Sequence, residues 1–136
     1  MKTRVFSMLV LLLALSTLVW ADDDFKLTAG PMVPAAQGKV SIDHDRNGND
    51  VVKMSVKHMA QPSALTPAKV NYVVWIQARG KDPENHGILR INENDAAASF
   101  STTTPYKTFD VFVTAEDTPN PTSPGGPEVL RGTVQQ

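Results

Sequence analysis

Residues 71–77, Asn-Tyr-Val-Val-Trp-Ile-Gln, constrain the fold of this chain more than any other stretch. They are rich in β-branched and aromatic residues, and turn-forming residues lie on both sides, so they predict a strand. Both alternating registers are apolar: one holds Val73 and Trp75, the other Tyr72, Val74 and Ile76. Because successive side chains of a strand point to opposite faces, both faces must be covered. We therefore expect a central strand that the rest of the chain encloses.

A hairpin over residues 38–59 is the clearest second feature. Val40 and Ile42 alternate with polar residues, and the return segment repeats this alternation. Between the two segments, Asn47-Gly48 predicts a type I′ turn, because both residues accept a positive φ.

The remaining segments add further short strands. Residues 109–116 predict a strong strand with Phe109, Val111 and Val113 in its core register, and shorter strands are expected at 87–91, 96–103 and 129–134. Pro62 and Pro67 make residues 60–69 an extended connection rather than a helix.

About seven short strands joined by turn signals predict an all-β domain, an immunoglobulin-like antiparallel β-sandwich over residues 38–136. Trp75 is expected to fill the space between the two sheets. Residues 22–37 contain Pro31 and Pro34, so we expect an irregular lead-in that forms an edge strand at best.

The first 21 residues have the features of a secretory signal peptide. Lys2 and Arg4 precede a leucine-rich apolar run, and Ala21 stands at the expected cleavage point. Cleavage would leave residues 22–136 without a stable membrane span, in the periplasm or outside the cell. The alternative is a retained anchor, although the run is short for a span of about 20 residues.

Composition narrows the classes of partner and site. The chain has no cysteine, which excludes disulfides, thiolate metal sites and a lipoprotein anchor. A secreted domain without disulfides is more typical of bacteria. Residues 22–136 carry 11 basic and 14 acidic side chains with no basic run, so nucleic acid is not an expected partner.

Residues 43–50 begin like a calcium-binding loop, with Asp43, Asp45, Asn47 and Asp50 at alternating or nearby positions. An EF-hand needs a glutamate where Met54 stands, and helices where strands are expected here. A polar hairpin turn is the favoured interpretation, and a loose calcium site is the open alternative.

No catalytic, cofactor or metal site is predicted. His44, His58 and His86 lack the spacing of a metal-ligating pair, and no Gly-x-Ser-x-Gly motif is present. Asp110 and Glu116 share one strand register but would lie about 20 Å apart, too far for acid and base partners. Both are expected on a solvated strand face.

An apolar patch is the one predicted interaction site. If Trp75 faces the core, the opposite register and Phe112 on the neighbouring strand point outward. Such a patch would be a binding or dimerisation face. Alternatively, the N-terminal segment or a long loop folds over it. The patch consists of Tyr72, Val74, Ile76 and Phe112.

The second half of the chain resembles a known family. Tyr72-Val-Val-Trp75, Gly87-Ile-Leu89, Val113-Thr-Ala-Glu116 and the Pro/Thr/Gly-rich segment 121–126 occur in that order. This pattern, over residues 70–132, resembles the extracytoplasmic C-terminal domain of anti-sigma-K factor proteins. The resemblance implies a β-sandwich outside the cytoplasm. It does not imply sigma-factor binding, because a cleavable signal replaces the sigma-binding region and membrane helix of that family.

We therefore expect a non-catalytic, secreted or periplasmic β-sandwich module that interacts with a protein or with the cell envelope. The alternative is a carbohydrate-binding module, which needs exposed aromatic rings, and Tyr106 and Phe112 are the candidates. A small hydrolase is a third possibility without a supporting constellation.

Overall fold

The computed structural model describes residues 24–136, so the predicted signal peptide lies outside the described residues. The described chain is all-β, with one 3-10 turn, η1 (Pro62–Ala64). None of its helical segments is long and apolar enough to cross a membrane. The eight strands are β1 (Asp24–Ala29), β2 (Gln37–His44), β3 (Asp50–Lys57), β4 (Asn71–Ala78), β5 (Glu84–Leu89), β6 (Ala98–Thr104), β7 (Phe109–Glu116) and β8 (Glu128–Val134).

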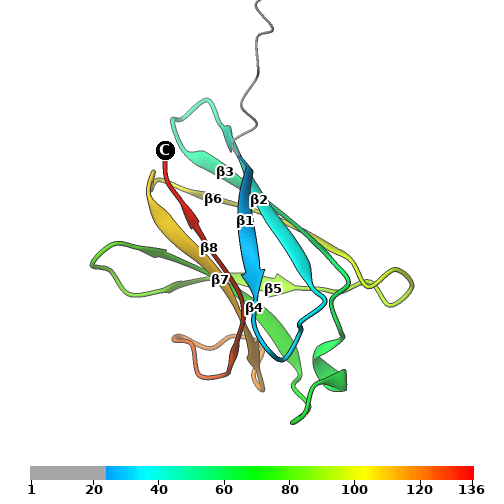
Figure 1. Cartoon of the computed structure of the whole chain (residues 1–136). Coiled ribbons are helices and arrows are strands. Elements are labelled where there is room, and N and C mark those ends of the chain that lie inside the picture. The colour runs from blue at the N-terminus through cyan, green and yellow to red at the C-terminus, as the bar shows by residue number, and fades with distance from the viewer. Residues whose placement is uncertain (1–23) are drawn as a thin grey trace, which may run out of the picture.

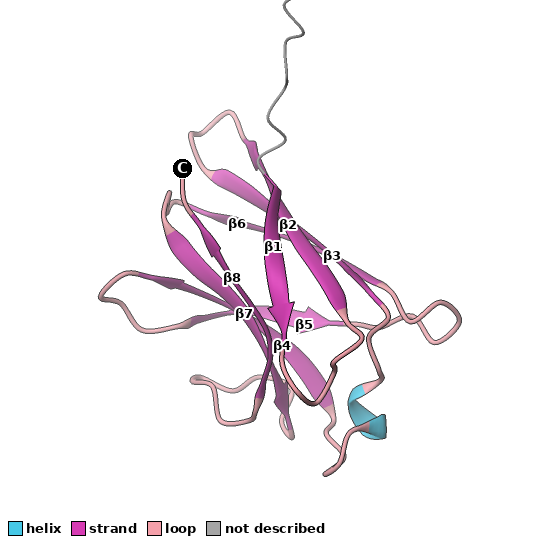
Figure 2. Ribbon diagram, in the orientation of Figure 1, coloured by secondary structure: helices cyan, strands magenta, loops and turns pink. Residues whose placement is uncertain are grey.

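The strands form an antiparallel β-sandwich, as the sequence predicts (Figure 1). Their order is β5-β4-β7-β8-β1-β2-β3-β6. We call β1, β2, β3 and β6 the first layer, and β5, β4, β7 and β8 the second layer (Figure 2). The main core lies between the layers and includes Val40, Val56, Phe109 and Leu130.

β1 connects the two layers, contrary to the expected irregular lead-in. Its residues from Asp24 to Leu27 pair with β2, while Thr28 and Ala29 pair with β8. Leu27 is buried in the main core. The prolines at 31 and 34 follow the strand and do not interrupt it, so the prediction of an edge strand at best is wrong. The domain includes residues before 38.

The predicted hairpin forms from β2 and β3, but its turn differs from the prediction. Five residues, 45–49, connect the strands, and Gly48 has a φ of 79° while Asn47 has a negative φ. The carboxylate of Asp45 accepts hydrogen bonds from the backbone N–H groups of Asn47 and Asn49 at 2.8 and 2.9 Å. This side chain supports a longer loop in place of a two-residue type I′ turn.

The two faces of β4 are opposite to the prediction. Tyr72, Val74 and Ile76 are buried in the main core, whereas Trp75 lies on the outer face of the second layer. β7 explains this arrangement. Val74 pairs directly with Val113, and Ile76 with Val111, and directly paired residues share a face. The core register of β7 was predicted correctly, so its partner residues on β4 face the core as well.

Trp75 is nonetheless fully buried, in a second apolar cluster with Val73 and Phe112. The rings of Trp75 and Phe112 stack with centroids 6.4 Å apart. The indole Nε1–H donates to Thr114 Oγ1 at 2.8 Å, which satisfies its polar group. The guanidinium of Arg131 lies 4.3 Å from the centroid of the Phe112 ring and covers it.

The loop of residues 117–127 covers the outer face of β4. It leaves β7 and reaches β5, where Asn85 Nδ2 donates to Pro121 O at 2.9 Å. Asn85 pairs directly with Trp75, so the loop crosses above the indole. The loop folds back beside β4 and β7 in Figure 1. The sequence left open that a long loop covers the outer face of this sheet, as the alternative to an exposed apolar patch.

Glu116 holds the far end of this loop and does not lie on a solvated face. Its side chain is buried, and its carboxylate accepts hydrogen bonds from the backbone N–H groups of Gly125 and Gly126, the shortest at 2.6 Å. A side chain on Gly126 would clash, since its Cβ would lie 1.7 Å from Ala115 O. The loop is therefore anchored at Glu116 and at Asn85.

The inward position of Tyr72 gives a titration that can be measured. The hydroxyl donates to Ala60 O at 2.7 Å, and burial raises the pKa of Tyr72 from 10.0 to about 12. The folded state thus retains the phenolic proton that the unfolded state loses above pH 10. The free energy of unfolding is expected to fall by roughly 3 kcal/mol as the pH rises through this range.

A Tyr106→Phe variant leaves Tyr72 as its single tyrosine. Tyrosinate absorbance at 295 nm should then rise with a midpoint near 12, and denaturant melts at increasing pH should show the loss of stability. Reversible titration near pH 10 in the folded variant would contradict the buried position of Tyr72.

Candidate functional site

The outer face of the first layer is polar and open. On β2 and β3 the inward residues are apolar except for the buried Asp50, so the intervening side chains point away from the core. Lys39 and Ser41 occupy these outward positions on β2, and Lys53, Ser55 and Lys57 occupy them on β3. The side chains of Lys39 and Lys53 are 62% and 55% exposed.

Strand pairing extends this arrangement over β6. Ser55 pairs with Ser99, and Lys53 pairs with Ser101, so the four side chains share one face. Arg90, which follows β5, borders the same surface near Ser99. We call this surface the lysine–serine face and define it by Lys39, Ser41, Lys53, Ser55, Lys57, Arg90, Ser99 and Ser101.

Three shallow hollows adjoin on the lysine–serine face, and Ser55 lines all three. The largest, of about 380 Å³, lies between Lys39, Lys53 and Ser101. A second of about 230 Å³ extends to Lys57, and a third of about 350 Å³ reaches Arg90. The face is therefore one continuous hollowed surface without a deep pocket.

The cations on this face differ in their ion pairs. Lys53 Nζ lies 2.6 Å from Asp43 Oδ2, and this contact lowers the pKa of Asp43. Lys39 Nζ lies 3.8 Å from Asp24. Among the described residues, no carboxylate lies within ion-pair distance of Lys57 or Arg90. These two side chains are the cations free to bind an anion.

One pairing on this side of the sheet opposes stability. Lys26 on β1 lies directly opposite Lys39 on β2. Like charges at directly opposed positions are destabilising.

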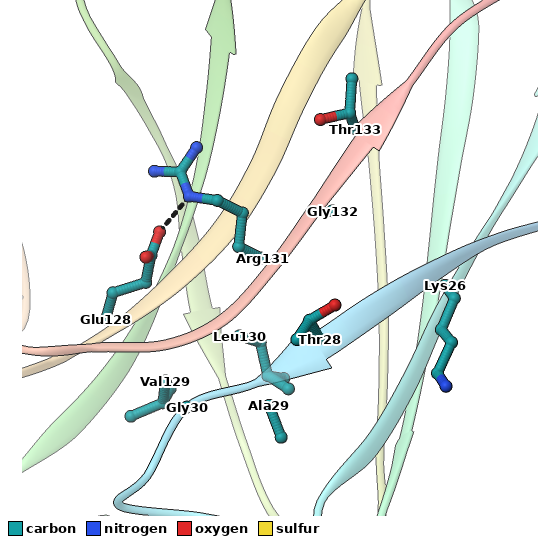
Figure 3. A pocket seen from close by; sticks show the side chains of 10 residues that line it. All are labelled: Lys26, Thr28, Ala29, Gly30, Glu128, Val129, Leu130, Arg131, Gly132 and Thr133. Carbon is teal, nitrogen blue, oxygen red and sulfur yellow. Dashed lines mark hydrogen bonds and ion pairs between the residues drawn. The ribbon is translucent and has the colours of Figure 1, made fainter.

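A groove between β1 and β8 is the main competing site, with a volume of about 470 Å³ (Figure 3). One of its two cations, Arg131, donates to Asp110 at 2.9 Å and also contacts Glu128 and the ring of Phe112. Thr133 Oγ1 donates to the same Asp110 at 2.8 Å. The polar groups on the β8 side of the groove thus satisfy one another. Lys26 points away from Arg131 in Figure 3.

A buried carboxylate, Asp50, joins three parts of the chain. Lys107 Nζ donates to it at 2.7 Å, His44 Nδ1 lies 2.9 Å away, and Gln136 Nε2 also donates to it. Burial alone would raise the pKa of Asp50, but the hydrogen bonds from Lys107 and Gln136 and the charge of Lys107 outweigh this effect, so the pKa is lowered. The cluster ties the hairpin to the segment before β7 and to the C-terminus.

These contacts bear on the calcium alternative. Asp43 is paired with Lys53, Asp50 is paired with Lys107, and Asp45 accepts backbone N–H groups from its own loop. The three carboxylates therefore have separate partners. Within residues 24–136, no group of three or more potential protein ligands is arranged to hold a metal ion.

The edge strands β5 and β6 are joined by polar side chains. His86 Nδ1 lies 2.8 Å from Thr102 Oγ1, and the hydroxyl of Tyr106 donates to Glu84 Oε1 at 3.0 Å. The Lys81 ammonium lies 6.0 Å from the centroid of the Tyr106 ring. This network links the edge strand of one layer to the edge strand of the other, at the two ends of the strand order.

The aromatic candidates for sugar stacking are engaged within the fold. Phe112 is 4% exposed and lies beneath Arg131, while Tyr106 is partly buried and contacts Glu84 and Lys81. Stacking of a sugar ring requires an accessible aromatic face. These two residues do not form an open platform.

The predicted apolar patch is wrong. Tyr72, Val74 and Ile76 lie in the main core, and Phe112 lies on the other side of the sheet in the cluster of Trp75. The prediction failed because it assigned the inward register of β4 to Trp75. The four residues are buried and do not form a common surface.

Part of the lysine–serine face can be recognised from the sequence. The alternation of lysine and serine along β2 and β3 is visible in the predicted hairpin. Ser99 and Ser101 join them only because β6 pairs with β3, more than 40 residues away along the chain. Charge counts along the sequence do not reveal this cationic face.

No family model, curated protein or solved structure matches this chain.

Proposed function

We propose that this chain is a non-catalytic extracytoplasmic module that attaches to a component of the cell envelope through its lysine–serine face. The predicted signal peptide supports the extracytoplasmic location. The resemblance of residues 70–132 to the extracytoplasmic domain of anti-sigma-K factor proteins is consistent with it and adds no sigma-factor role.

The difference between the two outer faces carries this proposal. The chain covers the second layer with its own loop, anchored at Asn85 and Glu116. Within residues 24–136 no such loop covers the lysine–serine face, and the side chains of Lys39 and Lys53 are more than half exposed. Lys26 and Lys39 stand at directly opposed positions, and a binding role for this side would account for two like charges there.

Blocking the lysine–serine face tests the proposal. Ser55 lines all three hollows, and a Ser55→Tyr replacement places a bulky ring at the position they share without changing charge. Tyrosine is favoured in strands, so the fold should persist. In a sedimentation assay with washed envelopes of the source organism, binding should fall about tenfold, equivalent to about 1.4 kcal/mol.

Gln135→Tyr serves as the matched control, because Gln135 is exposed and lies outside the face. This variant should sediment with envelopes like the unmodified chain. Equal binding by all three proteins, or no binding by the unmodified chain, would contradict the proposed function.

A further inference from the structure

We infer that the ligand of the lysine–serine face is a linear acidic polysaccharide bearing carboxylates; this inference rests on the proposed function. Three properties of the face point to this class of ligand: its charge, its hydroxyl groups and its extended shape.

The charge of this side differs from that of the remaining chain. Lys26, Lys39, Lys53, Lys57 and Arg90 oppose the carboxylates of Asp24, Asp43 and Asp95, which leaves a net charge of +2. The other described residues carry a net charge of −3. An anionic ligand is therefore attracted to this side and repelled elsewhere.

The free cations stand beside free hydroxyls. Lys57 and Arg90 line the same hollow as Ser55 and Ser99, and the two cations there outnumber its single carboxylate, Asp95. A guanidinium or ammonium group binds a carboxylate, and a serine hydroxyl both donates and accepts hydrogen bonds, as sugar hydroxyls do. This combination suits a polymer that alternates hydroxyl and carboxylate groups.

The chemistry of the face argues against a folded protein as the ligand. Protein interfaces generally have an apolar or aromatic centre with a polar rim. Here Ser55 lines all three hollows, and the apolar residues that also line the largest, Met54 and Phe100, are not exposed. The described residues place no exposed large aromatic on this surface for insertion into a lipid bilayer.

The shape of the face favours an extended ligand. The outward positions from Lys53 to Lys57 on β3 span roughly 14 Å, because a strand rises about 3.4 Å per residue. The hollows adjoin along this line and are shallow. An extended chain of sugar rings contacts such a surface along its length, which a small ligand does not.

Affinity electrophoresis of the full mature chain through gels containing polygalacturonate tests the inference. Retardation is expected with polygalacturonate and not with neutral dextran, and it should decrease with added salt. The variant Lys57→Gln/Arg90→Gln should bind polygalacturonate about tenfold more weakly, because two ion contacts are lost.

The control variant Arg46→Gln/Arg79→Gln removes two exposed cations outside the face and should change the affinity less than about twofold. Equal weakening in both variants would indicate general charge attraction and overturn the inference. Equal retardation by dextran, or stronger binding to vesicles of phosphatidylglycerol and phosphatidylcholine than to polygalacturonate, would also overturn it.

The polygalacturonate experiment and the envelope sedimentation experiment can fail independently. If Ser55→Tyr loses envelope binding but the unmodified chain does not bind polygalacturonate, the inference fails and the proposed function stands. If the unmodified chain binds neither envelopes nor polygalacturonate, both fail.

Discussion

Replacing Trp75 with alanine is expected to lower the free energy of unfolding by about 3–5 kcal/mol, the usual cost of removing a buried large aromatic. Trp75 is fully buried, stacks on Phe112 and donates to Thr114. Because it lies under the loop of residues 117–127, the loss should also release that loop. Denaturant melts measure the stability, and limited proteolysis under native conditions measures the exposure of the loop.

Trp75→Phe is the matched variant. It retains an aromatic ring against Phe112 but removes the indole N–H, so we expect a smaller loss of about 1–2 kcal/mol. Thr114→Val in the Trp75→Phe background should cost little more, since the hydrogen bond is already absent. A Trp75→Ala variant with unchanged stability, or with a loop as resistant to protease as before, would contradict the position of Trp75 under the loop.

Replacing Lys107 with methionine is expected to cost about 2–3 kcal/mol at neutral pH. The change leaves the buried carboxylate of Asp50 without its cation, and removal of one partner of a buried ion pair is more costly than loss of an exposed pair. Half of the Lys107 side chain is exposed, so the effect should be below the upper values seen for fully buried pairs.

The Lys107→Met replacement should also change the pH dependence of the free energy of unfolding. In the unmodified chain the pKa of Asp50 is below its usual 3.8, so its contribution to stability is present above that pH and is lost as the pH falls through the lowered pKa. Without Lys107 only the hydrogen bonds with Gln136 and His44 oppose the effect of burial, so the pKa of Asp50 should be higher than in the unmodified chain. The midpoint of acid unfolding should therefore move to higher pH, as followed by circular dichroism.

Lys53→Met is the control for this experiment. Lys53 also pairs with a carboxylate, but both side chains are exposed, at 55% and 61%. Such pairs contribute little, so the acid unfolding midpoint should not move. Equal shifts in the two variants, or none in Lys107→Met, would show that Asp50 does not depend on Lys107.

The Trp75→Ala and Lys107→Met variants test two parts of the fold that lie outside the lysine–serine face. The Trp75 cluster keeps the loop on the second layer, and the Asp50 cluster fixes the end of the β2–β3 hairpin. Neither cluster includes a residue of the lysine–serine face. Variants of the core and variants of the face can therefore be separated: the former should change stability and the latter should change binding.

The candidate site was only partly accessible from the sequence. The hairpin of β2 and β3 follows from a regular alternation that leaves one face apolar, so the outward lysines and serines were predictable there. Strand β6 consists of small residues apart from Phe100, and its alternation does not identify its neighbour. Its position beside β3 results from the topology of the whole chain.

The sequence by itself determined that this is an all-β sandwich and where most of its strands lie. It also determined which register of β7 faces the core, because Phe109, Val111 and Val113 occupy that register, whereas the opposite register is polar except for Phe112. It did not determine the inward face of β4, where both registers are apolar and the pattern is equally satisfied either way. Only the tertiary structure decided this: pairing with β7 turned Tyr72, Val74 and Ile76 into the core, and the loop of residues 117–127 covered Trp75 from outside. Both faces of β4 are apolar, and a loop anchored on β5 and β7 can bury the one that does not face the core. This is the physical reason that the outer face of the second layer is covered and the lysine–serine face is the uncovered outer face of the described chain.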